Sequence, residues 1–449
     1  MLKDMTEGKP LQLMIKFSIP LVIGNVLGMF YQLINSVIVG QMLGVSAFAS
    51  VGATISISWL VLSSVLGITF GFGAVFAHHY GAKDMDGLRR TFATAIYLTF
   101  ILGMTIGIGV GLGSRTFLAA LNTPAELLDG STIYLQVILF GMPITFFNCL
   151  IGAMLRALGD SKTPLKAMIL ASILNIFLDY ILVLPFGLAG VAGATLIAQF
   201  AAIVFCGVSL YKTGVLNGMK FKMDAVSAKA LLRLGLPLGF RNGVIEISGL
   251  IVHRYINSYG MVFVAGIAAS NRMYSILMIV AFAVEAAVAT FVAQNYGAKK
   301  VERIKEGVNV GIKLAFASVA VIMAFSLLCG RWILSLMIDS DSAQAVYVLE
   351  TAVRQLWIAV ICLPLLYMIF VYRAAIQGMG RPVIPVITGF VEMATRIVAV
   401  IFLSRLWGEW GVMISGPLGW LPAAVMLSVS FFVIFKRFSA SARVVSNEE

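Results

Sequence analysis

Four acidic residues stand deep inside long apolar stretches, where a carboxylate has little water around it: Asp179, Glu246, Glu285 and Glu392. Ionisable groups in lipid are costly, and they usually serve a function or pair with one another. Asp179 follows Asn175 by four residues, so the two side chains share one helix face. A carboxylate beside an amide oxygen can hold a sodium ion or take up a proton. The same two side chains can also form a hydrogen-bonded packing pair between helices.

The other three acids have different sequence surroundings. Glu392 precedes Arg396 by four residues, which is the favourable order for a structural ion pair on one helix. Glu246 and Glu285 have no obvious partner on their own helices. Each can face a central cavity and attract a cationic substrate, or can pair with Arg241 or Arg272. All three acids, together with Arg396, are candidates for a substrate cavity.

Two asparagines, Asn35 and Asn148, also lie in the middle of apolar stretches, where such side chains bridge helices or line cavities. The four cysteines and three histidines are scattered, so no metal is expected beyond a sodium ion at Asp179. No Walker A loop, G-x-S-x-G elbow or HExxH motif appears. We therefore expect no ATP-driven step, no enzyme activity and no cofactor.

The composition identifies the elements that must position these side chains. The chain is 60% hydrophobic and 12% charged, against roughly 25% charged residues in soluble domains. A spanning helix needs about 20 apolar residues. We predict an all-α integral membrane protein with twelve transmembrane helices, at approximately 14–43, 46–77, 91–113, 131–156, 165–183, 188–212, 231–258, 262–293, 307–329, 347–377, 386–404 and 411–436.

The basic residues are distributed unevenly between the two sides of these spans. Nearly all those in connecting loops fall on the side that holds both termini, and the opposite side has only Arg115, Arg331 and Arg405. Because positive residues favour the cytoplasm, we expect both termini to be cytoplasmic. The basic residues alternate with the spans and form no single stripe, so the net charge of +12 does not indicate a nucleic-acid partner.

The chain also repeats itself. Tyr80–Lys83 (YGAK) returns as Tyr296–Lys299, and further matched pairs keep nearly the same spacing: Pro20 with Pro237, Gly44 with Gly260, and Gly187 with Gly408. Six spans per repeat give both halves the same orientation, as in parallel-repeat transporters. We predict two parallel six-helix repeats around a central cavity, divided into 1–212, a cytoplasmic linker 213–230, and 231–449.

Several longer segments carry a family resemblance over nearly the whole chain. They include IPLVIGNVLGMFYQLINSVIVGQMLG, the two YGAK loops, MLRALGDSKTPLKAMILASILNIFLDYILV, GLAGVAGAT and AIQGMGRPVIP. In this order, the sequence resembles the MATE (multidrug and toxic compound extrusion) family of transporters, prokaryotic type. The resemblance implies twelve helices in two bundles around a V-shaped cavity. It also implies export of cationic or amphipathic drugs in exchange for sodium ions or protons.

The resemblance also implies a cation site in the N-terminal half. Carried over residue by residue, that site comprises Asp179, Asn175, Asn148 and Thr195. The family commonly has an acid where this chain has Asn35, so one expected carboxylate is missing. Glu246 lies one residue away from the position of a glutamate that another branch uses in its seventh helix.

We therefore expect a secondary active antiporter of small organic cations or amphipathic drugs, driven by a sodium or proton gradient through alternating access. It is expected in the cell (inner) membrane as a multi-pass monomer whose partners are these drugs and the lipid bilayer, without nucleic acid. The alternatives are a flippase for a lipid-linked saccharide, a membrane-embedded enzyme such as an acyl or glycosyl transferase, and an ion channel.

Overall fold

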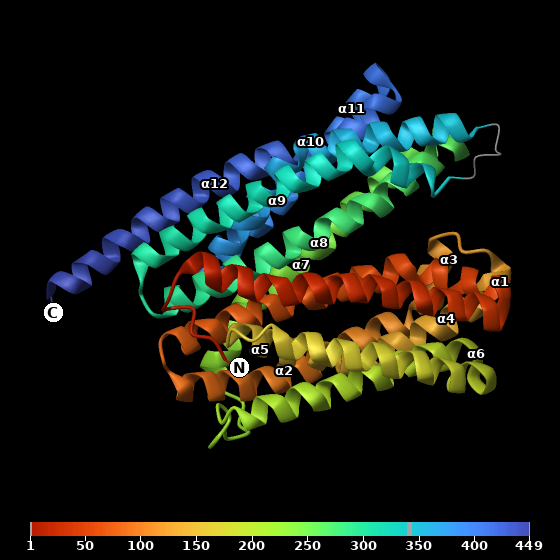
Figure 1. Cartoon of the computed structure of the whole chain (residues 1–449). Coiled ribbons are helices and arrows are strands. Elements are labelled where there is room, and N and C mark those ends of the chain that lie inside the picture. The colour runs from red at the N-terminus through yellow and green to blue at the C-terminus, as the bar shows by residue number, and fades with distance from the viewer. Residues whose placement is uncertain (1, 339–343, 449) are drawn as a thin grey trace. The chain divides into compact units, whose positions relative to one another are not determined.

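The computed structural model describes residues 2–338 and 344–448, and all of their regular secondary structure is α-helical (Figure 1). The helices are α1 (Pro10–Gly81), α2 (Met85–Leu112), α3 (Ser114–Ala120), α4 (Ala125–Phe140), α5 (Met142–Ala157), α6 (Lys162–Lys212), α7 (Ala225–Asn257), α8 (Met261–Gly297), α9 (Val301–Ser335), α10 (Ala345–Gly378), α11 (Val383–Trp407) and α12 (Glu409–Glu448). The predicted all-α fold class is confirmed.

Two helices each contain two membrane-length segments. The 72 residues of α1 would form a rod of about 108 Å, against a hydrocarbon core of about 30 Å. Its helix is interrupted at Gly44, where φ is 85° and ψ is 179°. In α6 the interruption is at Gly187, with φ 55° and ψ −133°. Positive φ suits glycine because it has no Cβ to clash with the backbone, so the predicted breaks at both places are confirmed.

The remaining helices complete the predicted set of spans. Within the described residues, eight helices are long and apolar enough to cross a bilayer, and the pair α4–α5 adds a ninth span bent by 48°. Because α1 and α6 each contribute two segments, and α7 supplies the more polar span, the predicted twelve segments are all present. The bend between α4 and α5 lies at Gly141, just before Pro143. Pro364 matches Pro143 at the same spacing as Gly408 matches Gly187, and it lies inside the continuous helix α10.

The sequence repeat is also visible in the backbone. Gly44 and Gly260 share one conformation, with φ and ψ of 85° and 179° in the first and 88° and 171° in the second. Gly187 and Gly408 share another, with φ 55° in both and ψ of −133° and −128°. Matching glycines therefore break the helices in the same way in both halves of the chain.

The chain forms two compact units by its internal contacts. Unit 1 comprises Met1–Asp4 and Ile19–Gly239, and unit 2 comprises Met5–Ser18 and Phe240–Glu449. The division passes through α1 and α7, so the first turns of each helix belong to one unit and the remainder belongs to the other. The sequence halves were defined by the repeat, whereas these units are defined by contacts.

In unit 1, α1 and α7 approach each other through glycines. A Cβ atom on Gly67 would lie 2.6 Å from the carbonyl oxygen of Leu238, and one on Gly71 would lie 2.7 Å from Cα of Gly235. A Cβ on Gly239 would lie 2.8 Å from the carbonyl oxygen of Ser64. Such spacing of small residues lets two helix backbones pack in contact.

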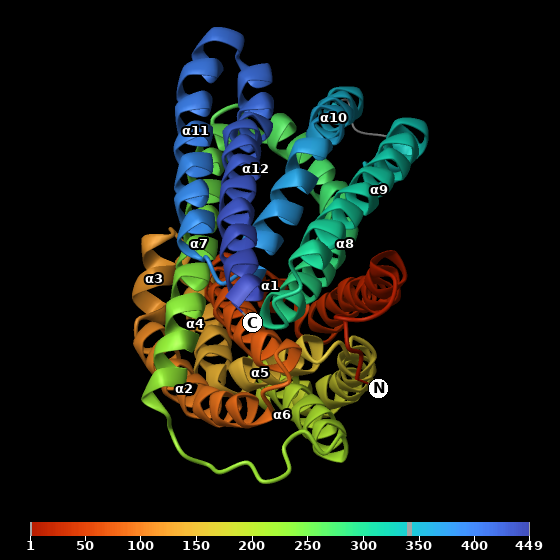
Figure 2. The same ribbon diagram turned by 90° about the vertical axis from the view of Figure 1, so that its left-hand side faces the viewer.

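The predicted linker between the halves, residues 213–230, contacts the first half of α2. Figure 2 shows its first part as a long loop between α6 and α7. Arg89 Nε donates to the carbonyl of Val215 at 2.8 Å, and the Tyr97 hydroxyl donates to the carbonyl of Phe221 at 3.3 Å. The backbone N–H of Asp224 donates to Thr94 Oγ1 at 3.0 Å. These bonds hold the loop within unit 1.

In unit 2, α8 packs chiefly on α10 and α9, and α11 pairs with α12, which lies beside it in both views (Figures 1 and 2). The N-terminal segment joins this unit at the end of α8. The backbone N–H of Met5 donates to Gln294 Oε1 at 2.7 Å, and Asn295 Nδ2 donates to the carbonyl of Met5 at 3.1 Å. Arg303 Nη2 donates to the carbonyl of Gly8 at 3.0 Å.

Candidate functional site

Unit 1 contains a polar cluster in an apolar setting. Asp179 and Asn175 lie on the first segment of α6 and are fully buried, with 0% and 1% exposure. The break at Gly187 allows the second segment to place Thr195 beside them, and Asn175 Nδ2 donates to Thr195 Oγ1 at 3.4 Å. The predicted Asn175, Asp179 and Thr195 therefore occupy two segments of one broken helix.

The first segment of α1 adds two more polar side chains. Asn35 Nδ2 donates to the hydroxyl of Tyr31 at 3.5 Å. The same Tyr31 hydroxyl hydrogen bonds with Thr195 and lies within electrostatic range of Asp179. Tyr31 was missed in the sequence, although its spacing of four residues from Asn35 places both on one helix face.

The oxygens of this cluster lack donors. Asp179 Oδ1 and Oδ2, Asn175 Oδ1 and Asn35 Oδ1 are buried and have no hydrogen-bond partner in the protein. Buried polar atoms are nearly always paired, because an unpaired one loses its hydration without compensation. Four oxygens without donors in one cluster are the feature expected where a cation is coordinated.

Apolar side chains hold the two broken helices together next to these oxygens. Val39 of α1 packs with Val183 and Val191 of α6, and Tyr134 of α4 lies against this cluster. Tyr134 is also within electrostatic range of Asp179. Asn148 lies half-buried on α5, and in the described part of the chain no hydrogen bond joins it to Asp179, Asn175 or Thr195.

Unit 2 contains the four predicted substrate-cavity residues, Glu246, Glu285, Glu392 and Arg396. Three of them, Glu285, Glu392 and Arg396, form ion pairs. Glu285 of α8 pairs with Arg373 of α10, whose Nη2 and Nε lie 2.6 and 2.8 Å from Glu285 Oε1. The two side chains are only 12% and 8% exposed. For Glu285 the candidate partners Arg241 and Arg272 were therefore wrong, because α8 packs chiefly against α10 and Glu285 meets the arginine of that helix.

Glu392 and Arg396 form the ion pair that their spacing predicts, with Arg396 Nη2 at 2.9 Å from Glu392 Oε1. Arg241 of α7 is 6% exposed, and its Nη1 donates to Asn242 Oδ1 at 3.0 Å. Glu246 lies half-buried on the same helix.

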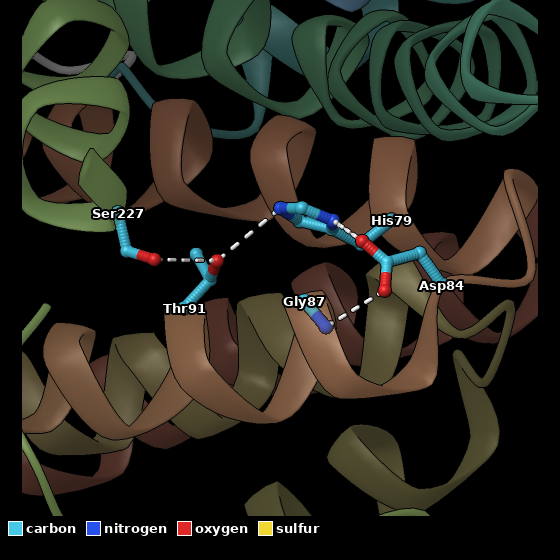
Figure 3. A network of polar contacts seen from close by, with 5 residues as sticks. All are labelled: His79, Asp84, Gly87, Thr91 and Ser227. Atoms are coloured by element: carbon cyan, nitrogen blue, oxygen red, sulfur yellow. Dashed lines mark hydrogen bonds and ion pairs between the residues drawn. The ribbon is translucent and has the colours of Figure 1, made fainter.

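A separate polar network lies at the loop between α1 and α2 (Figure 3). His79 Nδ1 lies 2.9 Å from Asp84 Oδ2, and its Nε2 lies 3.2 Å from Thr91 Oγ1, which in turn donates to Ser227 Oγ at 3.2 Å. The N–H of Gly87 donates to Asp84 Oδ1 at 2.8 Å. This bond, and secondarily His79, lowers the pKa of Asp84 below its ordinary value. The network joins α1, α2 and the start of α7.

No group of three or more His, Cys, Asp or Glu side chains with metal-binding geometry occurs among the residues that the structure describes. The unit 1 cluster contains one carboxylate, and its other oxygens come from amides and hydroxyls. Such a set suits a monovalent ion or a proton better than a transition metal, which prefers nitrogen and sulfur ligands.

Twelve membrane-length segments, repeated helix breaks and a buried set of unpaired oxygens define a multi-pass membrane transporter. The family model MatE matches residues 20–181 and 237–402. The chain is 30% identical to the probable multidrug resistance protein YoeA of Bacillus subtilis (strain 168), over 72% of this chain and 73% of that protein. The chain therefore belongs to the MATE family of multidrug efflux transporters, which are not enzymes.

Two further proteins are similar to this chain. The chain is 25% identical to a protein of Shewanella oneidensis named FAD transporter, over 67% of this chain and 69% of that protein. A solved structure described as the outward-facing conformation of a multidrug resistance MATE family transporter matches 97% of this chain and 98% of its own. Its TM-score is 0.87 at 23% identity, which shows a common fold.

Proposed function

We propose that this chain is a secondary active antiporter that exports small amphipathic organic compounds, organic cations among them, and takes up a cation through unit 1. Membership of the MATE family supports the export of organic compounds driven by an ion gradient. The observation that carries the cation assignment is the set of buried oxygens without donors at Asp179, Asn175 and Asn35.

The same oxygens favour Na⁺ over a proton as the coupling ion. A proton on Asp179 would supply one O–H donor, which could pair with at most one of the amide oxygens of Asn175 and Asn35 and would leave the other without a donor. Na⁺ is a hard cation that accepts several oxygen ligands at once, as other hard cations do. The hydroxyls of Tyr31 and Thr195 lie in the same cluster and can complete its coordination.

The test follows a fluorescent organic cation in proteoliposomes, with sodium and proton gradients imposed separately. Wild type is expected to respond to sodium, and Asp179→Asn is expected to lose gradient-driven movement. Asp129→Asn is the matched control, because Asp129 is an exposed carboxylate that pairs with Arg115 outside the cluster. A wild type driven by protons alone would exclude the sodium assignment, and an active Asp179→Asn variant would exclude the site.

A second variant, Asn35→Asp, restores the carboxylate that the family commonly has at this position. Because a second negative charge lies near the same cation, half-saturation is expected at a lower sodium concentration than in wild type. An unchanged sodium dependence would show that Asn35 does not face the bound ion.

We further propose that the protein is a monomer in the cell inner membrane, with both termini in the cytoplasm. The uneven distribution of basic residues between the loops supports this orientation. Fusing a reporter that fluoresces only in the cytoplasm to the C-terminus tests it, and a dark fusion of full-length, membrane-inserted protein would contradict it.

A further inference from the structure

The linker between the halves exposes apolar side chains that the folded chain leaves uncovered. Phe221, Met223 and Val226 are 67%, 47% and 78% exposed. The lysines of the linker stand beside them and are exposed as well. Exposed apolar side chains gathered in one place mark an interaction surface. The linker surface comprises Lys220, Phe221, Lys222, Met223, Val226 and Lys229.

Hydrogen bonds fix this surface on α2. The Tyr97 hydroxyl donates to the carbonyl of Phe221 at 3.3 Å, and the N–H of Asp224 donates to Thr94 Oγ1 at 3.0 Å. Tyr97 begins an uncharged exposed stripe at helical spacing, which continues with Phe100, Ile101, Met104 and Ile108. In a spanning helix, such a stripe faces lipid. The bond from Tyr97 therefore holds Phe221 at the end of a lipid-facing stripe.

The helices on either side of the linker surface show where the hydrocarbon begins. On α2, the exposed residue before Tyr97 is Arg90, about 10 Å nearer the start of the helix. On the exposed face of α7, Arg233 is followed by Leu236. Tyrosine is enriched at the boundary between lipid and water. Phe221, bonded to Tyr97, thus lies at the level of this boundary.

The charge of the linker indicates the kind of lipid. Residues 213–230 contain three lysines and one acid, Asp224, and so carry a net charge of +2. The Asp224 carboxylate accepts a hydrogen bond from the N–H of Ser227 at 2.7 Å, at the start of α7. On the facing part of α2, residues 84–97, two arginines balance two acids. The surplus therefore belongs to the lysines beside the exposed apolar residues, a combination that favours an anionic membrane surface.

We propose that the linker surface anchors the linker to the membrane by binding anionic phospholipids. The apolar side chains enter the interface, and the lysines contact the acidic headgroups. This binding is additional to the proposed transport function and requires neither the cation site nor an ion gradient.

Photochemical cross-linking tests the position of the surface. The photoreactive amino acid p-benzoylphenylalanine replaces Phe221 in the full-length protein, in nanodiscs of equal phosphatidylglycerol and phosphatidylcholine, and intact-protein mass spectrometry counts the lipid adducts. Phe100 of the stripe is the positive reference position. Asp86, whose side chain is 86% exposed about 16 Å before Tyr97 along α2, is the negative one.

Position 221 is expected to form lipid adducts as position 100 does, whereas position 86 is expected to form few. The absence of lipid adducts at position 221, or adducts joining two copies of the chain in their place, overturns the proposal.

The ratio of the two lipids in the adducts tests the charge preference. At position 221 the ratio of phosphatidylglycerol to phosphatidylcholine is expected to exceed that at position 100 by about fivefold, the effect of one lysine near an anionic surface. Equal ratios at the two positions overturn the preference for anionic lipid.

Substitutions then assign this preference to the lysines. Lys220→Gln with Lys222→Gln is expected to lower the ratio at position 221 to that at position 100, with phosphatidylcholine adducts retained. Lys305→Gln with Lys313→Gln is the matched control, because it removes two exposed lysines of α9 and is expected to leave the ratio unchanged. A ratio that survives the first change, or falls equally in the control, overturns the role of the lysines.

Discussion

Replacing Glu285 distinguishes a structural acid from one that recognises substrate. Its Oε1 accepts a hydrogen bond from Arg373 Nε at 2.8 Å and lies 2.6 Å from Nη2 of the same guanidinium, and both side chains are about nine-tenths buried. The Arg373 guanidinium also lies over the ring of Phe370, 4.4 Å from its centroid. We interpret the pair as an internal brace between α8 and α10.

The magnitude follows from the burial. Removing one member of a buried ion pair leaves the other charge desolvated and unpaired, and typically costs about 3–5 kcal/mol. Glu285→Gln is therefore expected to lower the midpoint of thermal unfolding by about 3–5 °C. Glu285→Gln combined with Arg373→Gln removes both charges, and is expected to recover most of the loss.

The assay measures thermal unfolding in detergent and transport of an organic cation in proteoliposomes for both single variants and the double variant. If the pair is a brace, the double variant is stable and transports. A Glu285→Gln variant as stable as wild type would refute the reasoning about burial. A stable double variant that no longer transports would place Glu285 in substrate recognition instead.

Two further predictions concern unit 1. Gly71→Val places a Cβ atom 2.7 Å from Cα of Gly235 and is expected to destabilise the protein by about 1–3 kcal/mol. Gly52→Val is the control, because a Cβ atom at Gly52 of the same helix meets open space, and its effect is expected to be milder. Equal thermal midpoints for the two variants would contradict the close packing of α1 on α7. Asp84→Ala removes the cap on α2 and is expected to cost about 1 kcal/mol at neutral pH. Because the folded pKa of Asp84 is lowered, this contribution is complete above its ordinary value of 3.8 and is lost as the pH falls through the folded value. A cost that persists unchanged in strong acid, measured as a difference in thermal midpoint, would contradict this assignment.

The sequence predicted the spans well because lipid imposes a simple rule on each segment. A membrane helix must be apolar over its own length, so its existence can be read locally. The breaks at Gly44 and Gly187 were also local, since each glycine separates two apolar runs and recurs in the repeat at Gly260 and Gly408.

Contacts between helices were predicted less well, because they depend on how each helix is rotated about its own axis and on how deep in the membrane each residue lies. Glu285 meets Arg373 through the packing of α8 on α10, which no spacing along the chain encodes. Tyr31 joins Thr195 from a different helix for the same reason. The pair Glu392–Arg396 was predictable because both members lie on one helix, four residues apart.

The structure also changes the meaning of Asn35. In the sequence, its presence in place of an acid suggested that the cation site had lost a ligand. In the folded chain its amide oxygen is one of the buried oxygens without a donor, alongside those of Asp179 and Asn175. The replacement therefore lowers the negative charge of the cluster and removes one oxygen, but the remaining amide oxygen is still available. One carboxylate neutralises one monovalent ion, whereas a second bound ion would leave an uncompensated buried charge, which is costly. A cluster with many oxygens and a single charge is accordingly suited to one Na⁺ at a time.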